Sequence, residues 1–523
     1  MQKLVLGLIT FGAFLAAPWL TSEFLGGNST PLFFLGATGA LFFVVYVLRD
    51  RCWMIIPLTL PIQGNLNFLP LNFSIQELSI MIVFSYLLFR MIFGLNVGWK
   101  LGPALVWLPL AGLLAVILFH WIESRDIGIK LLGGSGWGGR KYFKVVVALF
   151  SVPLLVSFPG FRWSDLQKVP MLYFLGSFVD IVPGTLTTLV PATSPFIYRF
   201  YSGVNLSEYQ SFASGAISRE AGVSRIAQFD QVGSAFSLLL LSYFPARTWI
   251  RPERLWVFPT ILLSGVLCAA SGFRNSVVRY FLSLLAALYT TIGLRSLLIL
   301  PCAAAFTLLV AFTQGKFFNY PMALQRALSF LPGDWNRKAK GEADASSEWR
   351  GKMKELFFEE YFSKNPLLGS GYHYDPIFAK QESDVYLASI ERARSITDKY
   401  FDVRGFIERR EPHEGLVHAL LVSGLLGTSF FVAYCLALLL FCFRNLRRTP
   451  RMEVAPIQTW AVSLLFTMIV AFFLLGGDYS SFFLLVCPIS ALLFRADQLL
   501  DAKEIAYNKS PAESNLHKSV NPM

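Results

Sequence analysis

The fold is decided by residues 415–443, which read GLVHALLVSGLLGTSFFVAYCLALLLFCF. This run contains no Asp, Glu, Lys or Arg, and it exceeds the ~20 apolar residues that a helix needs to cross a bilayer core of ~30 Å. A basic cluster follows it, with Arg444, Arg447, Arg448 and Arg451. Because Lys and Arg accumulate in cytoplasmic loops, the run predicts a transmembrane helix whose C-terminal end faces the cytoplasm.

Comparable apolar runs recur along the chain. Of its 523 residues, 54% are hydrophobic and only 15% are charged, and the mean hydropathy is +0.53, whereas soluble chains carry roughly 25% charged residues. The sequence therefore predicts an all-α, polytopic membrane protein with about 12–14 transmembrane helices. The predicted spans are 4–21, 32–48, 53–70, 75–94, 103–121, 142–158, 168–190, 232–246, 255–271, 276–293, 296–313, 415–443, 457–476 and 480–494. The third of these contains Pro57, Pro61 and Gly64, and we expect it to be either a span or a broken, re-entrant segment.

Two polar segments interrupt the spans and divide the chain. The predicted divisions are N-terminal transmembrane helices in 1–190, an extracytoplasmic loop in 191–231, transmembrane helices in 232–313, a large helical extracytoplasmic loop in 314–414, C-terminal transmembrane helices in 415–494, and a cytoplasmic tail in 495–523. The net charge of +12 fits basic cytoplasmic loops better than nucleic-acid binding. One segment departs from this pattern, since 122–141 carries Arg125, Lys130, Arg140 and Lys141 on the predicted outer side. Either a span is miscounted nearby, or these charges have a function.

The loop 314–414 contains a predicted amphipathic helix. We expect a polar, mobile stretch over Gly333–Ala345 and then a helix opened by Asp344 or Ser346 as the N-cap. Its apolar face would hold Trp349, Met353, Leu356 and Phe357, with Arg350 and Lys354 beside it. A second charged helical region is predicted over roughly 380–410.

Two residues at the predicted outer boundary carry candidate chemistry. Arg274 lies in a short hairpin between spans; it is either an arginine that reaches the lipid surface or a clamp for phosphate oxygens. His413 directly precedes a span; it is either an interfacial polar residue or a general base. His418 lies deeper, and we expect it to face other helices. The six cysteines are interpreted as packing residues, and no metal-binding spacing or ATP-binding motif is found.

Three separated segments together resemble the bacterial O-antigen ligase and O-antigen polymerase superfamily. The first is the hairpin Ser271–Ser276. The second is Arg350 followed by Asn365-Pro366-Leu367-Leu368-Gly369-Ser370-Gly371. The third is His413 followed by Gly424 and Gly427, with Glu414 at a position where the family has Asn and Val422 where it has an acidic residue. Arg225 resembles a weaker family arginine, and the match covers roughly residues 220–430.

The resemblance implies a metal-independent, inverting glycosyl transfer that requires no cofactor, on the outer face of the inner membrane and facing the periplasm. The donor would be a glycan on undecaprenyl pyrophosphate, and the acceptor a hydroxyl of lipid A–core or of another glycan. His413 would be the base, with Arg274 and Arg350 stabilising the pyrophosphate. Arg225 and Glu414 would contribute to substrate binding.

Three other interpretations stay open from the sequence. One is a transporter or flippase of polyprenyl-linked glycans, although no internal repeat is visible. The second is a protein O-oligosaccharyltransferase, and the third is a structural or assembly protein. Convergence of Arg274, Arg350 and His413 on one cavity would favour the glycan transferase, and scatter over about 20 Å, roughly two-thirds of the bilayer core, would favour the others.

Overall fold

A computed structural model describes most of the chain. The described residues are 47–67, 73–95, 97–124, 139–203, 228–249, 251–372, 401–408, 410–448 and 454–518. Four predictions therefore lie outside or largely outside these ranges: the spans 4–21 and 32–48, the candidate Arg225, and most of the charged region 380–410.

Regular structure in the described residues is helical, with no β-strand and only isolated bridges between extended segments. The all-α prediction is confirmed. In chain order the elements are η1 (Arg49–Met54), α3 (Ile55–Thr59), α4 (Ile75–Ile92), α5 (Ala104–Glu123), α6 (Gly139–Ser157), α7 (Trp163–Leu166), α8 (Val169–Leu189), η3 (Pro191–Thr193), α9 (Ser194–Phe200), α11 (Gln228–Tyr243), η4 (Ala246–Thr248), η5 (Pro252–Arg254), α12 (Val257–Ala270), α13 (Arg274–Ile292), η6 (Gly293–Leu298), α14 (Ile299–Thr313), α15 (Met322–Leu328), α16 (Arg337–Leu356), η7 (Phe357–Tyr361), η8 (Phe362–Lys364), α18 (Phe401–Glu408), α19 (Gly415–Arg448), α20 (Pro456–Leu475) and α21 (Tyr479–Lys518).

Eight helical segments in the described part are long and apolar enough to cross a membrane. Seven of them match one predicted span each, and the eighth, Arg274–Thr313, covers both 276–293 and 296–313. Two further predicted spans are seen as the helices α6 and α11, of 19 and 16 residues. The chain is therefore a multi-pass membrane protein.

The predicted span 53–70 is not one continuous helix. It begins within the 3₁₀-helix η1, continues through the five-residue helix α3, and leaves helical geometry after Pro61. Asn65 then forms a β-bridge with Ser74. Prolines at positions 57 and 61 remove backbone donors that a continuous helix needs, so the broken form is the one adopted.

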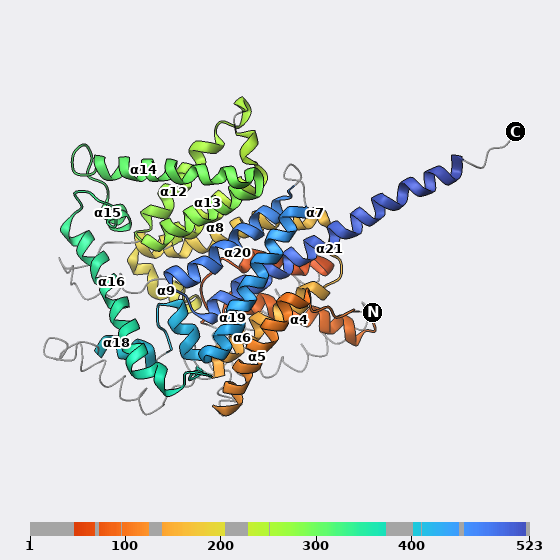
Figure 1. Cartoon of the computed structure of the whole chain (residues 1–523), viewed down its shortest axis with the longest axis horizontal. Coiled ribbons are helices and arrows are strands. Elements are labelled where there is room, and N and C mark those ends of the chain that lie inside the picture. Colours follow the sequence, from red (N-terminus) through yellow and green to blue (C-terminus); the bar gives the residue numbers. More distant parts are fainter. Residues whose placement is uncertain are drawn as a thin grey trace, which may run out of the picture.

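Two groups of helices make up the membrane part (Figure 1). The larger packs α4, α5 and α6 against α19, α20 and α21 around one hydrophobic core, with α6 lying along α21 and α5 along α19. The smaller packs α11, α12 and α13 together, and α13 joins the two groups through α20. The helices α15, α16 and α18 lie at one side of this assembly, where the candidate site is found.

Basic side chains gather at one end of the larger group. Arg51 and Lys168 both pair with Asp165, at 3.0 and 3.1 Å. Arg495 packs over the ring of Phe161 nearby, and Arg448 pairs with an aspartate further along α21. The starts of α6 and α19 and the hairpin before α13 lie at the opposite end. Arg448 and Arg495 belong to segments that the sequence assigns to the cytoplasmic side, and the structure places them at the same end as Arg51 and Lys168.

Candidate functional site

The hairpin between α12 and α13 places Arg274 at the first residue of α13. Gly272 has φ of +79°, a left-handed conformation that glycine adopts without strain. The guanidinium of Arg274 donates hydrogen bonds to the carbonyl of Ala343 and, over 3.1 Å, to the hydroxyl of Ser347, both on α16. Arg274 is therefore held against α16.

The helix α16 begins earlier than the sequence predicts. It starts at Arg337, and the side chain of Asn336 caps it by accepting a 2.9 Å hydrogen bond from the backbone. The predicted start at Asp344 or Ser346 is wrong, and the stretch Gly333–Ala345 is helical from Arg337 onward. Alanine, lysine and glutamate favour helix strongly, and they outweigh the polar character of this segment.

Helix α16 connects the hairpin to the start of α19. Near its N-terminal half, Ala339 and Ala343 are buried, and α15 and α16 pack together there. At its C-terminal end Met353 and the following Leu356 and Phe357 are buried against α18 and the first turns of α19. The predicted apolar face therefore exists, and Arg350 lies between the two anchored ends.

One cavity of about 340 Å³ lies at this position. Its volume falls in the ~300–1,000 Å³ range of small-molecule sites. The side chains that line it come from α16, α18 and the segment before α19: Ser346, Trp349, Arg350, Phe406 and His413. Arg350 and His413, which are 63 positions apart in the sequence, thus share one cavity.

The charges around the cavity are arranged for an anion. Arg274 and Arg350 are close enough for their like charges to repel, and Asp344 offsets part of this repulsion. No described residue accepts a hydrogen bond from the Arg350 guanidinium, so its donors are available to a ligand. Each guanidinium offers a fork of donors that suits phosphate oxygens; Arg350 lines the cavity, and Arg274 lies outside the lining but near enough to add its charge.

His413 is exposed on one side, and its ring lies against two aromatic rings. The centroid distances are 5.7 Å to Trp349 and 5.4 Å to Phe406. Partial burial lowers the pKa of His413 below its ordinary value of 6.5; the charge of Arg350 lowers it further, while those of Glu411 and Asp478 oppose the shift. The imidazole is therefore mostly neutral near pH 7, as a general base requires.

Two other predicted residues have different surroundings. Glu414 is largely buried and pairs at 3.2 Å with Lys354 on α16, so its carboxylate helps to hold α16 against α19. His418 is buried among aromatic rings, with its Nε2 3.5 Å from the hydroxyl of Tyr372. The described residues contain no group of three or more His, Cys, Asp or Glu side chains placed to hold a metal ion.

The glycine motifs of the second and third segments contact each other. Helix α19 is interrupted at Gly424, whose φ and ψ are 60° and −165°. The backbone groups freed there pair with the turn 365–371: Ser370 and Gly371 donate to carbonyls of α19 at 2.7 and 3.0 Å, and the amide of Leu425 donates to the turn at 2.9 Å. A Cβ on Gly369 would lie 2.5 Å from the backbone nitrogen of Gly424. Both glycines therefore permit a close approach of two backbones.

The sequence reasoning missed Asp478, which lies near the candidate base. Gly476, two positions before Asp478, has φ of +113°, and a Cβ there would lie 2.1 Å from the carbonyl oxygen of His413. Burial alone would raise the pKa of Asp478. The charges of His418 and Lys144, with hydrogen bonds from the two serines that follow, hold that pKa well below its usual range. The only sequence signal was an aspartate after two glycines between two spans.

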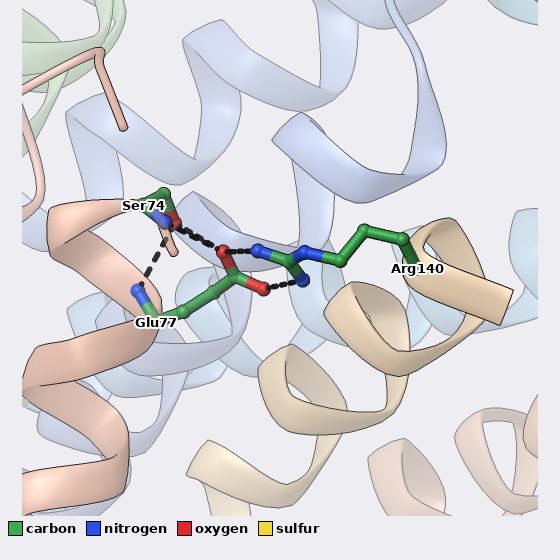
Figure 2. A network of polar contacts seen from close by, with 3 residues as sticks. All are labelled: Ser74, Glu77 and Arg140. Carbon is green, nitrogen blue, oxygen red and sulfur yellow. Dashed lines mark hydrogen bonds and ion pairs between the residues drawn. The ribbon is translucent and has the colours of Figure 1, made fainter. Parts of the chain in front are cut away.

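Of the four charges named in the segment 122–141, Arg125 and Lys130 lie outside the described residues, and Arg140 and Lys141 have partners. Lys141 pairs with Glu411 at 3.2 Å, which links the start of α6 to the residues before His413. Arg140 donates two hydrogen bonds to the buried carboxylate of Glu77, and Ser74 completes this network as the cap of α4 (Figure 2). Lys141 thus contacts the segment that carries His413, whereas Arg140 stabilises the start of α4.

An apolar cavity of about 290 Å³ begins close to the hairpin. It lies between α13 and α14 and is closed by two residues that follow α15. Its lining residues are Val277, Val278, Phe281, Leu282, Leu285, Leu300, Ala303, Ala304, Thr307, Phe330 and Leu331. Val277 is less than one helical turn from Arg274, so the apolar cavity and the arginine are neighbours.

The fold and site define a multi-pass membrane protein with a cationic cavity and a histidine at one end of its helices. No protein-family model matches the chain, and no curated protein matches it.

Proposed function

We propose that this chain is a membrane glycosyltransferase similar to the O-antigen ligases and polymerases. It would move a glycan from undecaprenyl pyrophosphate to an acceptor hydroxyl during the synthesis of a surface polysaccharide. The observation that carries the proposal is the shared cavity of Arg350 and His413, with Arg274 fastened to the same helix one turn away. A transporter or a structural protein would not require this convergence.

The proposed reaction uses each of these groups once. The acceptor hydroxyl attacks the anomeric carbon of the donor sugar, while His413 takes the hydroxyl proton. The bond between that carbon and the pyrophosphate oxygen breaks, and the pyrophosphate leaves with the electron pair. Arg350 and Arg274 stabilise the negative charge that develops on it. A glycosidic bond with inverted configuration results.

The lipid part of the donor has a matching surface. The apolar cavity between α13 and α14 begins at Val277, beside Arg274. A polyprenyl chain lying there would leave its pyrophosphate at the hairpin, within reach of the arginines. This arrangement supports a lipid-linked donor in preference to a soluble sugar nucleotide.

The clustering of basic residues at the other end supports the proposed sidedness. Cytoplasmic ends of spans are enriched in Lys and Arg, and Arg51, Lys168, Arg448 and Arg495 lie together at that end. The cavity would then face the periplasmic side of the inner membrane.

Transfer from a purified lipid-linked donor by single variants tests the proposal. His413→Ala should lower turnover by about 10²–10⁴-fold, the usual contribution of general-base catalysis, while the protein still binds donor. His418→Ala should lose stability through packing but retain far more turnover, since His418 is buried. Glu414→Gln should weaken the contact with Lys354 without abolishing transfer.

Two results would contradict this assignment. Normal turnover in His413→Ala with an inactive Glu414→Gln would make Glu414 the base. Absence of transfer in the unmodified protein with every lipid-linked donor, despite donor binding, would favour a transporter of such glycans. Glycan profiles of a deletion strain then separate the acceptors: single repeats left on lipid A–core indicate a polymerase, and accumulated lipid-linked chains indicate a ligase.

A further inference from the structure

We propose that Trp349 and Phe406 form a stacking platform for the donor's first pyranose ring, the sugar whose anomeric carbon carries the pyrophosphate. This inference rests on the proposed function and names the part of the substrate that the cavity would hold. It assigns to the two aromatic residues a role in sugar recognition that is distinct from the roles of Arg350 and His413.

The geometry places both rings on the cavity and beside the candidate base. The ring centroids of Trp349 and Phe406 are 5.1 Å apart at 87°, an edge-to-face contact that fixes their relative orientation. His413 contacts both rings at tilted angles of 44° and 49°. The imidazole is therefore not stacked flat on either ring, and all three line the cavity.

The two aromatic residues lie at the edge of a buried cluster and also border the cavity. Met353, Leu356 and Phe357, at most 1% exposed, belong to the cluster that anchors α16 to α18 and α19. Trp349 and Phe406 pack against this cluster but are only partly buried, so part of each side chain faces the cavity. No described residue accepts a hydrogen bond from the Trp349 indole N–H, so that donor is available to a sugar hydroxyl.

The mixed chemistry of the cavity suits a pyranose. Such a ring has apolar C–H faces, which pack on aromatic rings, and a rim of hydroxyl groups, which need polar partners. Ser346, the Trp349 indole and Arg350 offer those partners on the same lining. Because Arg350 and His413 line the same cavity as Trp349, a sugar ring on Trp349 would have its pyrophosphate within reach of Arg350 and its anomeric carbon within reach of His413.

Binding of two probes to the full-length protein tests the platform. One probe is the lipid-linked glycan donor, and the other is undecaprenyl pyrophosphate without sugar. Trp349→Leu, which keeps an apolar side chain but removes the aromatic face, should weaken donor binding roughly three- to tenfold. It should leave the sugar-free probe unaffected, and Trp349→Phe should restore most of the donor affinity.

Trp256→Leu is the matched control. Trp256 is 47% exposed and makes a similar edge-to-face contact, 5.2 Å from Phe244, but it lies at the end of α12 away from the hairpin. Its substitution should change neither affinity.

Each outcome decides the inference separately from the proposed function. Equal weakening of both probes by Trp349→Leu would reduce Trp349 to a support for the fold and overturn the platform. Unchanged donor affinity would overturn it as well, even if transfer activity is intact. If Trp349→Leu weakens binding of the lipid-linked glycan donor but not of sugar-free undecaprenyl pyrophosphate, the platform is supported. That result would support it even if the unmodified protein shows no transfer.

Discussion

At the scale of single residues, Arg350 and His413 affect each other by charge as well as by position. Arg350 lowers the pKa of His413, and it lies near the like charge of Arg274. Binding of an anionic pyrophosphate would neutralise part of that positive field. Binding of the pyrophosphate would therefore raise the pKa of His413 and make its imidazole a stronger base. Donor binding would in this way be coupled to activation of the acceptor.

We expect Arg350→Lys to be nearly as damaging to transfer as Arg350→Ala. A guanidinium offers two parallel donors to phosphate oxygens, whereas an ammonium is a single point of charge. Turnover of the two variants with purified lipid-linked donor checks this, with Lys352→Arg, on the same helix but outside the cavity lining, as the control. Near-normal product from Arg350→Lys would show that the site needs only a positive charge.

The dependence of transfer on pH should report His413. Since the base must be neutral, kcat/KM should rise with pH through the pKa of His413, which lies below its ordinary value of 6.5, and level off above it. The carboxylate of Glu411 opposes the lowering, so Glu411→Gln should move the rising limb to still lower pH. The exposed Glu355, substituted by Gln, should leave the profile in place. If the rising limb of the pH profile keeps its position in Glu411→Gln and is present in every variant, His413 is not the titrating group.

At the scale of elements, the interruption of α19 is the feature that sets the site. The backbone groups freed at Gly424 form hydrogen bonds with the turn 365–371, which follows α16, η7 and η8. These bonds hold that turn against α19 and so help to fix His413 relative to Arg350. The two glycine motifs that supported the family resemblance therefore have a structural explanation in backbone contact, whatever the substrate.

Gly424→Ala should destabilise the protein strongly. Alanine is strained at this φ and ψ, at a cost of order 1–3 kcal/mol, and its Cβ would lie 2.3 Å from the carbonyl oxygen of Leu367. Gly341→Ala is the control, because a Cβ there meets nothing within 4 Å in the exposed part of α16; it should be neutral or stabilising by about 0.5–1 kcal/mol. Thermal unfolding in detergent compares the two variants, and equal melting temperatures would show that the contact between Gly424 and the turn 365–371 does not stabilise the protein.

Elements with an apolar signal were predictable, and those stabilised by distant contacts were not. The spans followed from hydropathy, and the C-terminal half of α16 followed from the spacing of Trp349 and Met353. The N-terminal half was missed because its buried residues, Ala339 and Ala343, are small and stand among charges. For the site, His413 followed from its position directly before a span and Arg350 from the motif resemblance, whereas Asp478 and Lys141 approach it only through tertiary packing.

At the scale of the whole molecule, the two ends of the helices differ in chemistry. One end carries ion pairs of basic residues with Asp165 and Asp501. The other carries the hairpin, the cavity and the long loop with α16. This polarity explains why the net charge of +12 is compatible with a membrane protein, and it predicts which end a reagent outside the cell membrane can reach.

An impermeant thiol reagent should label Gly341→Cys in intact spheroplasts and Arg251→Cys only after lysis. Both positions are exposed, on α16 and before α12 respectively. Of the six native cysteines only Cys302 is exposed, so Cys302→Ala supplies the background. Labelling of Arg251→Cys in intact spheroplasts, with Gly341→Cys protected, would invert the proposed orientation.

The buried pair of Glu77 and Arg140 has a consequence for how the protein is made. The ribosome synthesises Glu77 before Arg140, which follows 63 positions later. Until α6 emerges, α4 carries an uncompensated carboxylate in its first turn, which would be costly to bury without its partner. We therefore expect α4 to settle fully only together with α6, so that the insertion machinery handles the two as one unit. A nascent chain arrested between them should remain accessible to proteolysis around α4.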